Sequence, residues 1–465
     1  MLTRSTMLLV TALLLAGCGA DATPQPAAGD VGPKPGGTLV LGENADEPAC
    51  LDPHQLSTTN TTVVGRPIFD SLLWQDAEGD LKPWLASAWK VSDDGLTYTF
   101  TLRDGVTFHD GSAWNAEALK LNLEHMRDPA TKSPLAASYI APYRDAKVVD
   151  EHTLQVRLSS PYSAFLNVLA QSYLAMLSPE QLKEAPASTC EHPVGSGPFV
   201  FDKWTKGQSI TYRKNPGYTW APTGRTGPAY LDGLEIRFLA EDATRYNALL
   251  AGEVNVIDNT PPASDFTAGR GISHDPAKAS TLLDEAGWSA KDKDGIRLKD
   301  GKRLTAVAID TGVNPQNTQI LVQAQAAAAK AGIEIRIDNV TAQESQDRTG
   351  KGDFDVSVGI WTTNTADVLW IQYSSKNITT PERRGQNTTR LADDDLDKLL
   401  EEARARTNAA ERAGIYGKAQ TRLLELAPAI PLYDRPSLVS AQKRVHGLTW
   451  DYAYGAVTFH DAWVS

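Results

Sequence analysis

The sequence GLTYTFTLRDGVTFHDG, residues 95–111, decides the fold. Its first half alternates apolar and polar residues, with Leu96, Tyr98, Phe100 and Leu102 as the apolar positions. Because successive side chains of a strand point to opposite faces, this period of two predicts a half-buried strand. Asp104-Gly105 is a strong turn signal. We therefore expect a hairpin in which residues 106–108 begin the return strand.

Outward from this stretch, strand patterns and helix patterns are mixed along the whole chain. Short apolar or alternating runs predict strands at residues 38–41, 153–158, 234–239, 254–257, 333–337 and 354–360. Helical spacing predicts helices at residues 115–126, 243–251 and 316–331, with one or two more between residues 396 and 424. Such mixing predicts an α/β fold.

The N-terminus has the pattern of an export signal. One positive charge at Arg4 precedes the apolar run of residues 7–16, which is too short to cross a bilayer as a helix. Leu15-Ala16-Gly17-Cys18 follows, so residues 1–17 are expected to be a lipoprotein signal peptide and Cys18 the lipidated residue. An ordinary signal with a chance cysteine is the alternative. Residues 18–36 are rich in Ala, Pro, Gly and Asp, which is typical of a flexible tether.

Length, charge and cysteine content narrow the class of protein. A chain of 465 residues is longer than one core usually supports, so two or three lobes are expected. The formal net charge of -12 argues against nucleic acid as a partner, because binding a phosphate backbone needs a basic face. After Cys18 only Cys50 and Cys190 remain, which suggests one disulfide in an oxidising compartment or two free buried thiols.

The sequence gives catalysis, cofactors and metals little support. It contains no Gly-x-Ser-x-Gly nucleophile motif and no glycine-rich phosphate loop, and Gly195-Ser196-Gly197 is typical of a turn. The eight histidines include no pair at helical ligand spacing, so no metal site is expected. Asp393-Asp394-Asp395 lacks the glycine and glutamate of a calcium loop and fits a helix start instead. We expect a binding protein, not an enzyme.

Several segments in a fixed order resemble one protein family. They include Leu51-Asp52-Pro53-His54, residues 68–73, Leu81-Lys82-Pro83-Trp84, the stretch 95–111, Val194-Gly195-Ser196-Gly197-Pro198-Phe199, Asn215-Pro216-Gly217-Tyr218, Gly252-Glu253-Val254-Asn255-Val256 and Ala429-Ile430-Pro431-Leu432-Tyr433. Together they resemble the peptide/nickel-binding family of ABC-transporter solute-binding proteins. This family includes dipeptide- and oligopeptide-binding proteins.

The resemblance implies a two-lobed, type II periplasmic-binding-protein fold with the ligand in a cleft between the lobes. Lobe I is expected to span residues 37–259, lobe II residues 260–427, and the return to lobe I residues 428–465. Family members usually carry a longer stretch after the Gly-Glu-Val segment, whereas here residues 260–271 pass almost directly to residues 275–288. Lobe II is therefore expected to be shortened.

The resemblance also implies ligand-binding residues. Oligopeptide binders carry Trp-x-x-Asp in the cleft, where the aspartate pairs with the peptide ammonium, and the matching residues here are Trp361, Thr362, Thr363 and Asn364. An asparagine cannot supply that charge, so either Asp367 does so or the ligand is not an ordinary free peptide. Trp361 could equally be a core residue at a strand end.

Two further positions match cleft residues of the family. Ser57, Thr58 and Thr59 match a ligand-contacting loop, and a plain polar loop is the alternative. Arg435 could meet a ligand carboxylate with two parallel hydrogen bonds, or it could be a surface arginine paired with Asp434.

The expected function is that of an extracytoplasmic lipoprotein, held at the bacterial cell membrane by its lipid anchor. It would act as a monomer that delivers a solute, most simply a peptide, to ABC permease subunits. A nickel chelate or another small solute is the alternative ligand. A non-transporting surface sensor is the alternative role.

Overall fold

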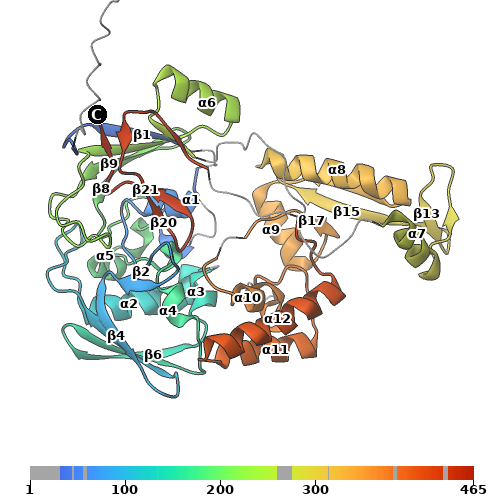
Figure 1. The fold of residues 1–465 in the computed structure, drawn as a ribbon, viewed down its shortest axis with the longest axis horizontal. Coiled ribbons are helices and arrows are strands. Elements are labelled where there is room, and N and C mark those ends of the chain that lie inside the picture. Colours follow the sequence, from blue (N-terminus) through green and yellow to red (C-terminus); the bar gives the residue numbers. More distant parts are fainter. Residues whose placement is uncertain are drawn as a thin grey trace, which may run out of the picture.

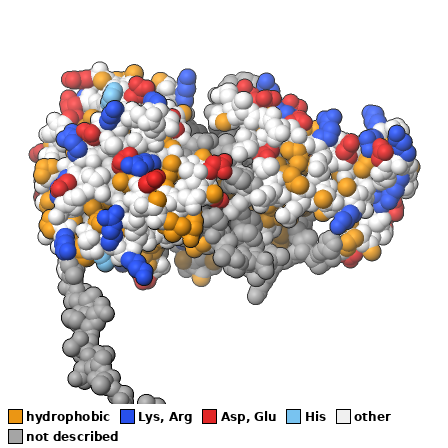
Figure 2. All heavy atoms as spheres, turned by 90° about the horizontal axis from the view of Figure 1, so that it is seen from above, with side chains coloured by type: hydrophobic (Ala, Val, Ile, Leu, Met, Phe, Trp, Pro, Cys, Tyr) orange, Lys and Arg blue, Asp and Glu red, His pale blue; other side chains and the backbone are white. Residues whose placement is uncertain are grey.

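The computed structural model describes residues 32–43, 47–55, 60–133, 135–258, 275–312, 314–361, 363–380, 385–432 and 438–465. These residues form two bodies of unequal size, the larger at the left of Figure 1 and the smaller at the right. Within the described ranges, the longest helices are too short or too polar to span a lipid bilayer. Lys, Arg, Asp and Glu side chains are interspersed on the face shown in Figure 2.

The larger body contains a six-stranded mixed sheet with the order β18-β11-β1-β10-β9-β8. Its strands are β1 (Thr38–Glu43), β8 (Phe199–Thr205), β9 (Ser209–Lys214), β10 (Gly233–Phe238), β11 (Val256–Ile257) and β18 (Ser440–Ala441). β1 lies at the centre, parallel to both β10 and β11. The strands predicted near residues 38, 234 and 254 are thus confirmed, and the last is shorter than expected.

The stretch 95–111 belongs to a second, four-stranded sheet with the order β4-β5-β7-β6. Its strands are β4 (Ala86–Val91), β5 (Thr97–Leu102), β6 (Tyr143–Asp150) and β7 (Thr153–Leu158). The predicted alternation in β5 is confirmed, because Tyr98, Phe100 and Leu102 are buried. The predicted hairpin is wrong, because both edges of β5 are already occupied by β4 and β7. Residues 106–108 turn into the core instead.

Short helices cover these sheets. They are α1 (Asn60–Gly65), α2 (Ala116–Arg127), α3 (Ala136–Tyr139), α4 (Phe165–Val168), α5 (Pro179–Glu184), α6 (Asp242–Ala251) and the 3-10 turns η1 (Pro53–Gln55), η2 (Pro129–Thr131), η3 (Ser172–Leu174) and η4 (Pro186–Ser188). The Asn115 side chain accepts a hydrogen bond from Ala118 N, which satisfies one free amide at the start of α2. Gly252, at φ 80°, ends α6, where a residue with a Cβ would be strained.

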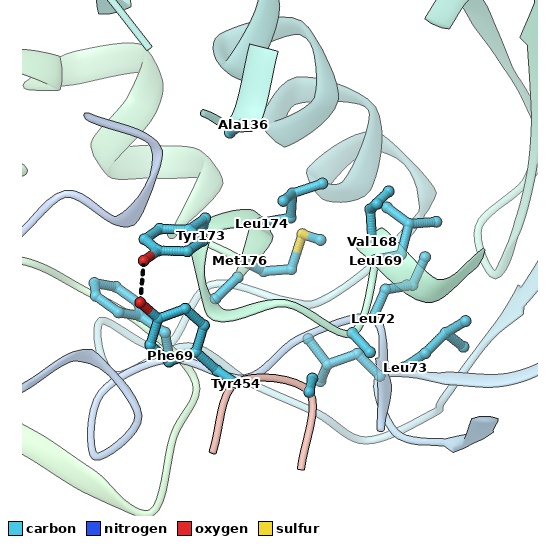
Figure 3. Packing of buried hydrophobic residues seen from close by; sticks show 14 of the residues in the cluster. Phe69, Leu72, Leu73, Ala136, Val168, Leu169, Tyr173, Leu174, Met176 and Tyr454 are labelled. Atoms are coloured by element: carbon cyan, nitrogen blue, oxygen red, sulfur yellow. Dashed lines mark hydrogen bonds between the residues drawn. The ribbon is translucent and has the colours of Figure 1, made fainter. Parts of the chain in front are cut away.

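Hairpins complete the larger body and one large hydrophobic cluster joins its parts. The hairpins are β2 (Leu73–Gln75) with β3 (Leu81–Pro83) and β20 (Thr449–Asp451) with β21 (Ala456–Thr458), and the second is flanked by the antiparallel pair of β19 (Val445–His446) and β22 (Trp463–Val464). Figure 3 shows part of the cluster, in which Leu72 and Leu73 pack near Val168, Leu169 and Leu174. Residues from both ends of the chain thus stabilise one core.

The smaller body is built on a three-stranded parallel sheet with the order β16-β15-β17. Its elements are α7 (Pro276–Glu285), β12 (Ala290–Lys291), β13 (Arg297–Lys299), β14 (Lys302–Arg303), β15 (Thr305–Asp310), α8 (Pro315–Ala331), β16 (Glu334–Asn339), α9 (Ala342–Lys351) and β17 (Val356–Ser357). The predictions for α8 and β16 are confirmed. The strand predicted at residues 354–360 is only two residues long, and Ile360 is exposed.

Three further helices lie between the two bodies in Figure 1. They are α10 (Val368–Tyr373), α11 (Asp394–Ala405) and α12 (Ala409–Leu426), with the 3-10 turn η5 (Ser375–Asn377). Their buried residues, such as Ile371, Leu400 and Ala419, belong to the same hydrophobic cluster as the larger body. Asp393 caps α11 by accepting from Leu396 N, so the acidic run does begin a helix.

The chain passes between the bodies at two neighbouring places. It leaves the larger body after β11, and β18 pairs with β11 when the chain returns, in the register Val256↔Ala441. In the larger body a disulfide joins Cys50 and Cys190, the two cysteines that remain after Cys18.

Candidate functional site

The segment 361–367 links β17 to α10 and carries several of the predicted site residues. Trp361 is partly buried and packs against the large hydrophobic cluster. Burial raises the pKa of the Tyr139 hydroxyl to about 12, and the nearby side chains of Thr363 and Trp361 lower it by less. The structure therefore places Trp361 at the junction between the two bodies, where its indole ring contributes to packing.

Asn364 is tied to the larger body by three hydrogen bonds. Its Nδ2 donates to Oε1 of Gln75 at 3.0 Å and to the backbone oxygen of Asn167 at 2.9 Å. Its Oδ1 accepts from Nε2 of Gln171 at 2.6 Å. An aspartate could not donate to the first two oxygens, so this environment requires an amide. Asn364 thus connects segment 361–367 to the larger body.

Asp367 is already neutralised inside the protein. Its side chain is almost fully buried, lies 2.8 Å from Nε of Arg404, and accepts a hydrogen bond from the Tyr162 hydroxyl at 2.8 Å. Burial lowers the pKa of Arg404, but the combined attraction of Asp367, Tyr162 and Glu401 offsets this, so that the pKa is raised. Asp367, the acid that the resemblance offered for a ligand ammonium, thus already has a cationic partner within the protein.

Arg404 is also held by aromatic rings. The carbon at the centre of its guanidinium lies 3.8 Å from the ring centroid of Trp370 and 4.5 Å from that of Tyr162. Such cation–π contacts favour the charged form of arginine. Because α10, α11 and the larger body each contribute a group, this cluster locks the helices between the two bodies to the larger one.

Tyrosines of the larger body adjoin the same segment. The Tyr173 hydroxyl donates to the Tyr454 hydroxyl at 2.9 Å, and the two rings meet edge to face (Figure 3). Tyr139, Tyr173 and Tyr454 are all buried, so their rings belong to the hydrophobic cluster of the larger body.

The remaining predicted ligand residues lie outside the described residues. Ser57, Thr58 and Thr59 fall between η1 and α1, Thr362 follows Trp361, and Arg435 falls between α12 and β18. The structure therefore brings together Trp361, Thr363 and Asn364 of the predicted set.

The structure also contains features that sequence patterns did not reveal. A small pocket lies within the larger body, lined by Trp74, Trp84, Tyr218 and Phe459 among others. Arg66, which also lines the pocket, already donates hydrogen bonds to Asp451, to Ser71 and to the backbone oxygen of Ala170. A second feature is the meeting of Asp52, His54 and His125. No spacing rule could find it, because 71 residues separate the two histidines.

Comparison with known proteins agrees with the two-lobed fold. The chain is 23% identical to the ABC transporter-associated periplasmic binding protein DppA of Helicobacter pylori in complex with the peptide STSA, with a TM-score of 0.73 and 93% and 98% of the two chains covered. It is 19% identical to the oligopeptide-binding protein AppA of Bacillus subtilis, with a TM-score of 0.80 and 93% and 100% covered. It is 23% identical to NikZ of Campylobacter jejuni in complex with Ni(L-His), with a TM-score of 0.75 and 88% and 95% of the two chains covered.

Curated relatives match along nearly the whole chain. The probable D,D-dipeptide-binding periplasmic protein DdpA of Escherichia coli is 26% identical, with 89% of this chain and 91% of the relative covered. The glutathione-binding protein GsiB of Escherichia coli is also 26% identical, with 89% and 92% covered. The resemblance stated from the sequence is thereby confirmed, as is the type II α/β fold.

The family model for the middle region of bacterial extracellular solute-binding proteins, family 5, matches residues 80–270 and 259–379. These ranges cover more than half of the 465 residues. Members are extracytoplasmic solute-binding components of ABC importers and are not known as enzymes. The chain therefore belongs to the bacterial extracellular solute-binding proteins of family 5.

Proposed function

We propose that this protein captures peptides between its two lobes and delivers them to an ABC permease. The observation that carries the proposal is the position of segment 361–367, which lies against Tyr139 and Gln171 where the two bodies meet. Two curated relatives, each matched over about nine-tenths of its own length, are named for dipeptide or glutathione binding. The names of these relatives are the support for a peptide-like solute.

The proposed peptide site differs from a charge-based one. The side-chain amide of Asn364 is already hydrogen-bonded to Gln75, Asn167 and Gln171, and Asp367 is paired with Arg404. Neither side chain has a charge to offer to an α-ammonium. We infer that the peptide is held through its backbone and side chains, so that a blocked N-terminus is tolerated.

The domain boundaries follow as part of the proposal. Lobe I comprises residues 37–259 and 428–465, and lobe II residues 260–427 in a shortened form. The support for the shortening is the sequence itself, in which residues 260–271 pass almost directly to residues 275–288. Helices α10–α12 belong to lobe II by sequence but share the core of lobe I.

We also propose a lipid anchor at Cys18 and a location at the outer face of the cell membrane. The support is the Leu15-Ala16-Gly17-Cys18 sequence after a short apolar run. Several acyl chains would hold the protein stably, since each buried methylene contributes about 0.8 kcal/mol. In cell fractionation, Cys18→Ala should move the protein from the membrane fraction into the soluble fraction. A variant that stays with the membrane contradicts the anchor.

A thermal-shift screen tests the ligand class. We expect di- to pentapeptides to raise the unfolding temperature of the purified protein, because a ligand at 100 times its Kd stabilises the folded state by about 2.7 kcal/mol. Nickel–histidine chelates, sugars and free amino acids form the comparison panel. A shift with nickel–histidine alone supports the second candidate, suggested by the NikZ neighbour. A panel without any shift argues for a non-transporting role.

A further inference from the structure

A compact group of metal-ligating side chains lies in the larger body, apart from segment 361–367. Asp52 and His54 come from η1 and its approach, and His125 comes from the last turn of α2. One oxygen or nitrogen of each residue lies within 4.8 Å of the others, and the two Nδ1 atoms are 2.8 Å apart. Asp52 and His54 are fully buried, while the His125 side chain is 15% exposed.

The hydrogen bonds fix the protonation of this group. Nε2 of His54 lies 2.8 Å from the backbone oxygen of Ala175, which can only accept, so Nε2 carries the proton. Nδ1 of His54 must then accept the proton of Nδ1 of His125 at 2.8 Å. Nδ1 of His54 therefore carries a lone pair that faces His125.

Asp52 is positioned as firmly as the histidines. Its carboxylate accepts hydrogen bonds from His54 N at 2.9 Å, from Nε2 of Gln55 at 3.0 Å and from Oγ1 of Thr189 at 2.9 Å. A carboxylate has about four lone-pair sites, so one remains. The disulfide of Cys50 holds the chain two residues before Asp52. This outer layer of hydrogen bonds is the kind that orients metal ligands in proteins.

We propose that Asp52, His54 and His125 bind one divalent transition-metal ion of tetragonal preference, Cu²⁺ or Ni²⁺. Two nitrogen ligands about 2.05 Å from an ion and 2.8 Å apart subtend an angle of about 90° at the metal. That angle suits tetragonal Cu²⁺ or Ni²⁺ with nitrogen and oxygen ligands, whereas tetrahedral Zn²⁺ needs nitrogens about 3.3 Å apart. Remaining coordination positions would be filled by water.

Binding requires one proton to move and none to be lost. The His125 proton leaves Nδ1, which takes the ion, and passes to Nε2, which lies 3.9 Å from Oδ2 of Asp52. The ion is thereby held by two neutral imidazoles and one carboxylate. Its path from solvent runs past His125, the exposed member of the group.

Calorimetry of the purified, chelator-treated full chain with NiCl₂ and CuCl₂ tests the site. We expect one ion per chain for the unaltered protein and at least a tenfold weaker affinity for His125→Ala. The matched control is His152→Ala, which removes an exposed histidine paired with Asp104, and we expect unchanged binding. Equal affinity of the unaltered protein and His125→Ala, or a loss with His152→Ala as well, would overturn the proposal.

An electron paramagnetic resonance spectrum of the Cu²⁺-loaded protein gives a second readout that needs no variant. We expect splitting from two nitrogen ligands. A spectrum with one nitrogen or with oxygen ligands alone would contradict the site even if copper binds. Peptide binding is not involved in either measurement, so the metal proposal and the proposed transport role fail separately.

Discussion

The carboxylate of Asp367 lies 2.8 Å from Nε of Arg404, and both side chains are buried where the larger body meets helices α10 and α11. In this position the ion pair joins the larger body, α10 and α11, which border segment 361–367. It also removes the acid that sequence reasoning offered as the partner of a ligand ammonium. The same contact therefore concerns both stability and ligand choice.

Breaking this pair should be costly. Asp367→Asn leaves the Arg404 guanidinium buried without its counter-ion, and we expect the free energy of unfolding to fall by about 3–5 kcal/mol. Chemical denaturation measures it. The control is Glu402→Gln, which removes the partner of Arg406 in an exposed pair and should cost less than about 1 kcal/mol. Equal small losses in both variants would show that the buried pair is not a stabilising contact.

Asn364→Asp should weaken the attachment of segment 361–367 to the larger body. A carboxylate faces Oε1 of Gln75 and the backbone oxygen of Asn167, two acceptors to which it cannot donate. We expect a loss of about 1–3 kcal/mol in unfolding free energy and a larger radius of gyration by small-angle X-ray scattering. Asn317→Asp, within the smaller body, should leave that radius unchanged. No change in either quantity for Asn364→Asp counts against the attachment.

His109 should make stability depend on pH. Burial lowers its pKa to about 4 in the folded protein, against about 6.5 when unfolded. Between these values the unfolded chain binds the extra proton, so stability is lost as the pH falls from 6.5 to 4, by about 3 kcal/mol in all. His109→Gln lacks this titration. The difference in unfolding free energy between the two proteins should therefore change by that amount between pH 7 and pH 4, and a constant difference contradicts the burial argument.

The disulfide should stabilise the larger body strongly. It closes a loop across 140 positions of sequence separation, for which the chain-entropy model gives about 5 kcal/mol. The double variant Cys50→Ser, Cys190→Ser should lose most of this in a denaturant titration, and reducing agent should then have no further effect. If the variant is as stable as the oxidised protein, the bond contributes little.

Much of the fold could be predicted from the sequence because local periodicity determines it. β5, α8 and the cap at Asn115 follow from alternation, helical spacing and a side-chain acceptor. The hairpin prediction failed because a turn signal does not say which neighbour a strand pairs with, and β4 and β7 took both edges of β5. Pairing depends on contacts between distant residues.

The site was less predictable for the same reason. The match to Trp-x-x-Asp singled out residues 361–364, but no local pattern shows that Asn364 faces Gln75 or that Asp367 faces Arg404. His54 and His125 come together only through the packing of η1 against α2 and η3. Residues that are distant in sequence decide whether a polar side chain is free for a ligand.

Calorimetric titration with one peptide in two forms, with a free and with an acetylated N-terminus, tests the central claim most directly. The account predicts saturable binding of one peptide per chain in both forms, with Kd values within about threefold, because neither Asn364 nor Asp367 has a charge to offer. A hundredfold loss on acetylation, equivalent to about 2.7 kcal/mol, would show that an acid recognises the ammonium. Absence of heat with both forms, while a non-peptide solute binds, would contradict peptide capture itself.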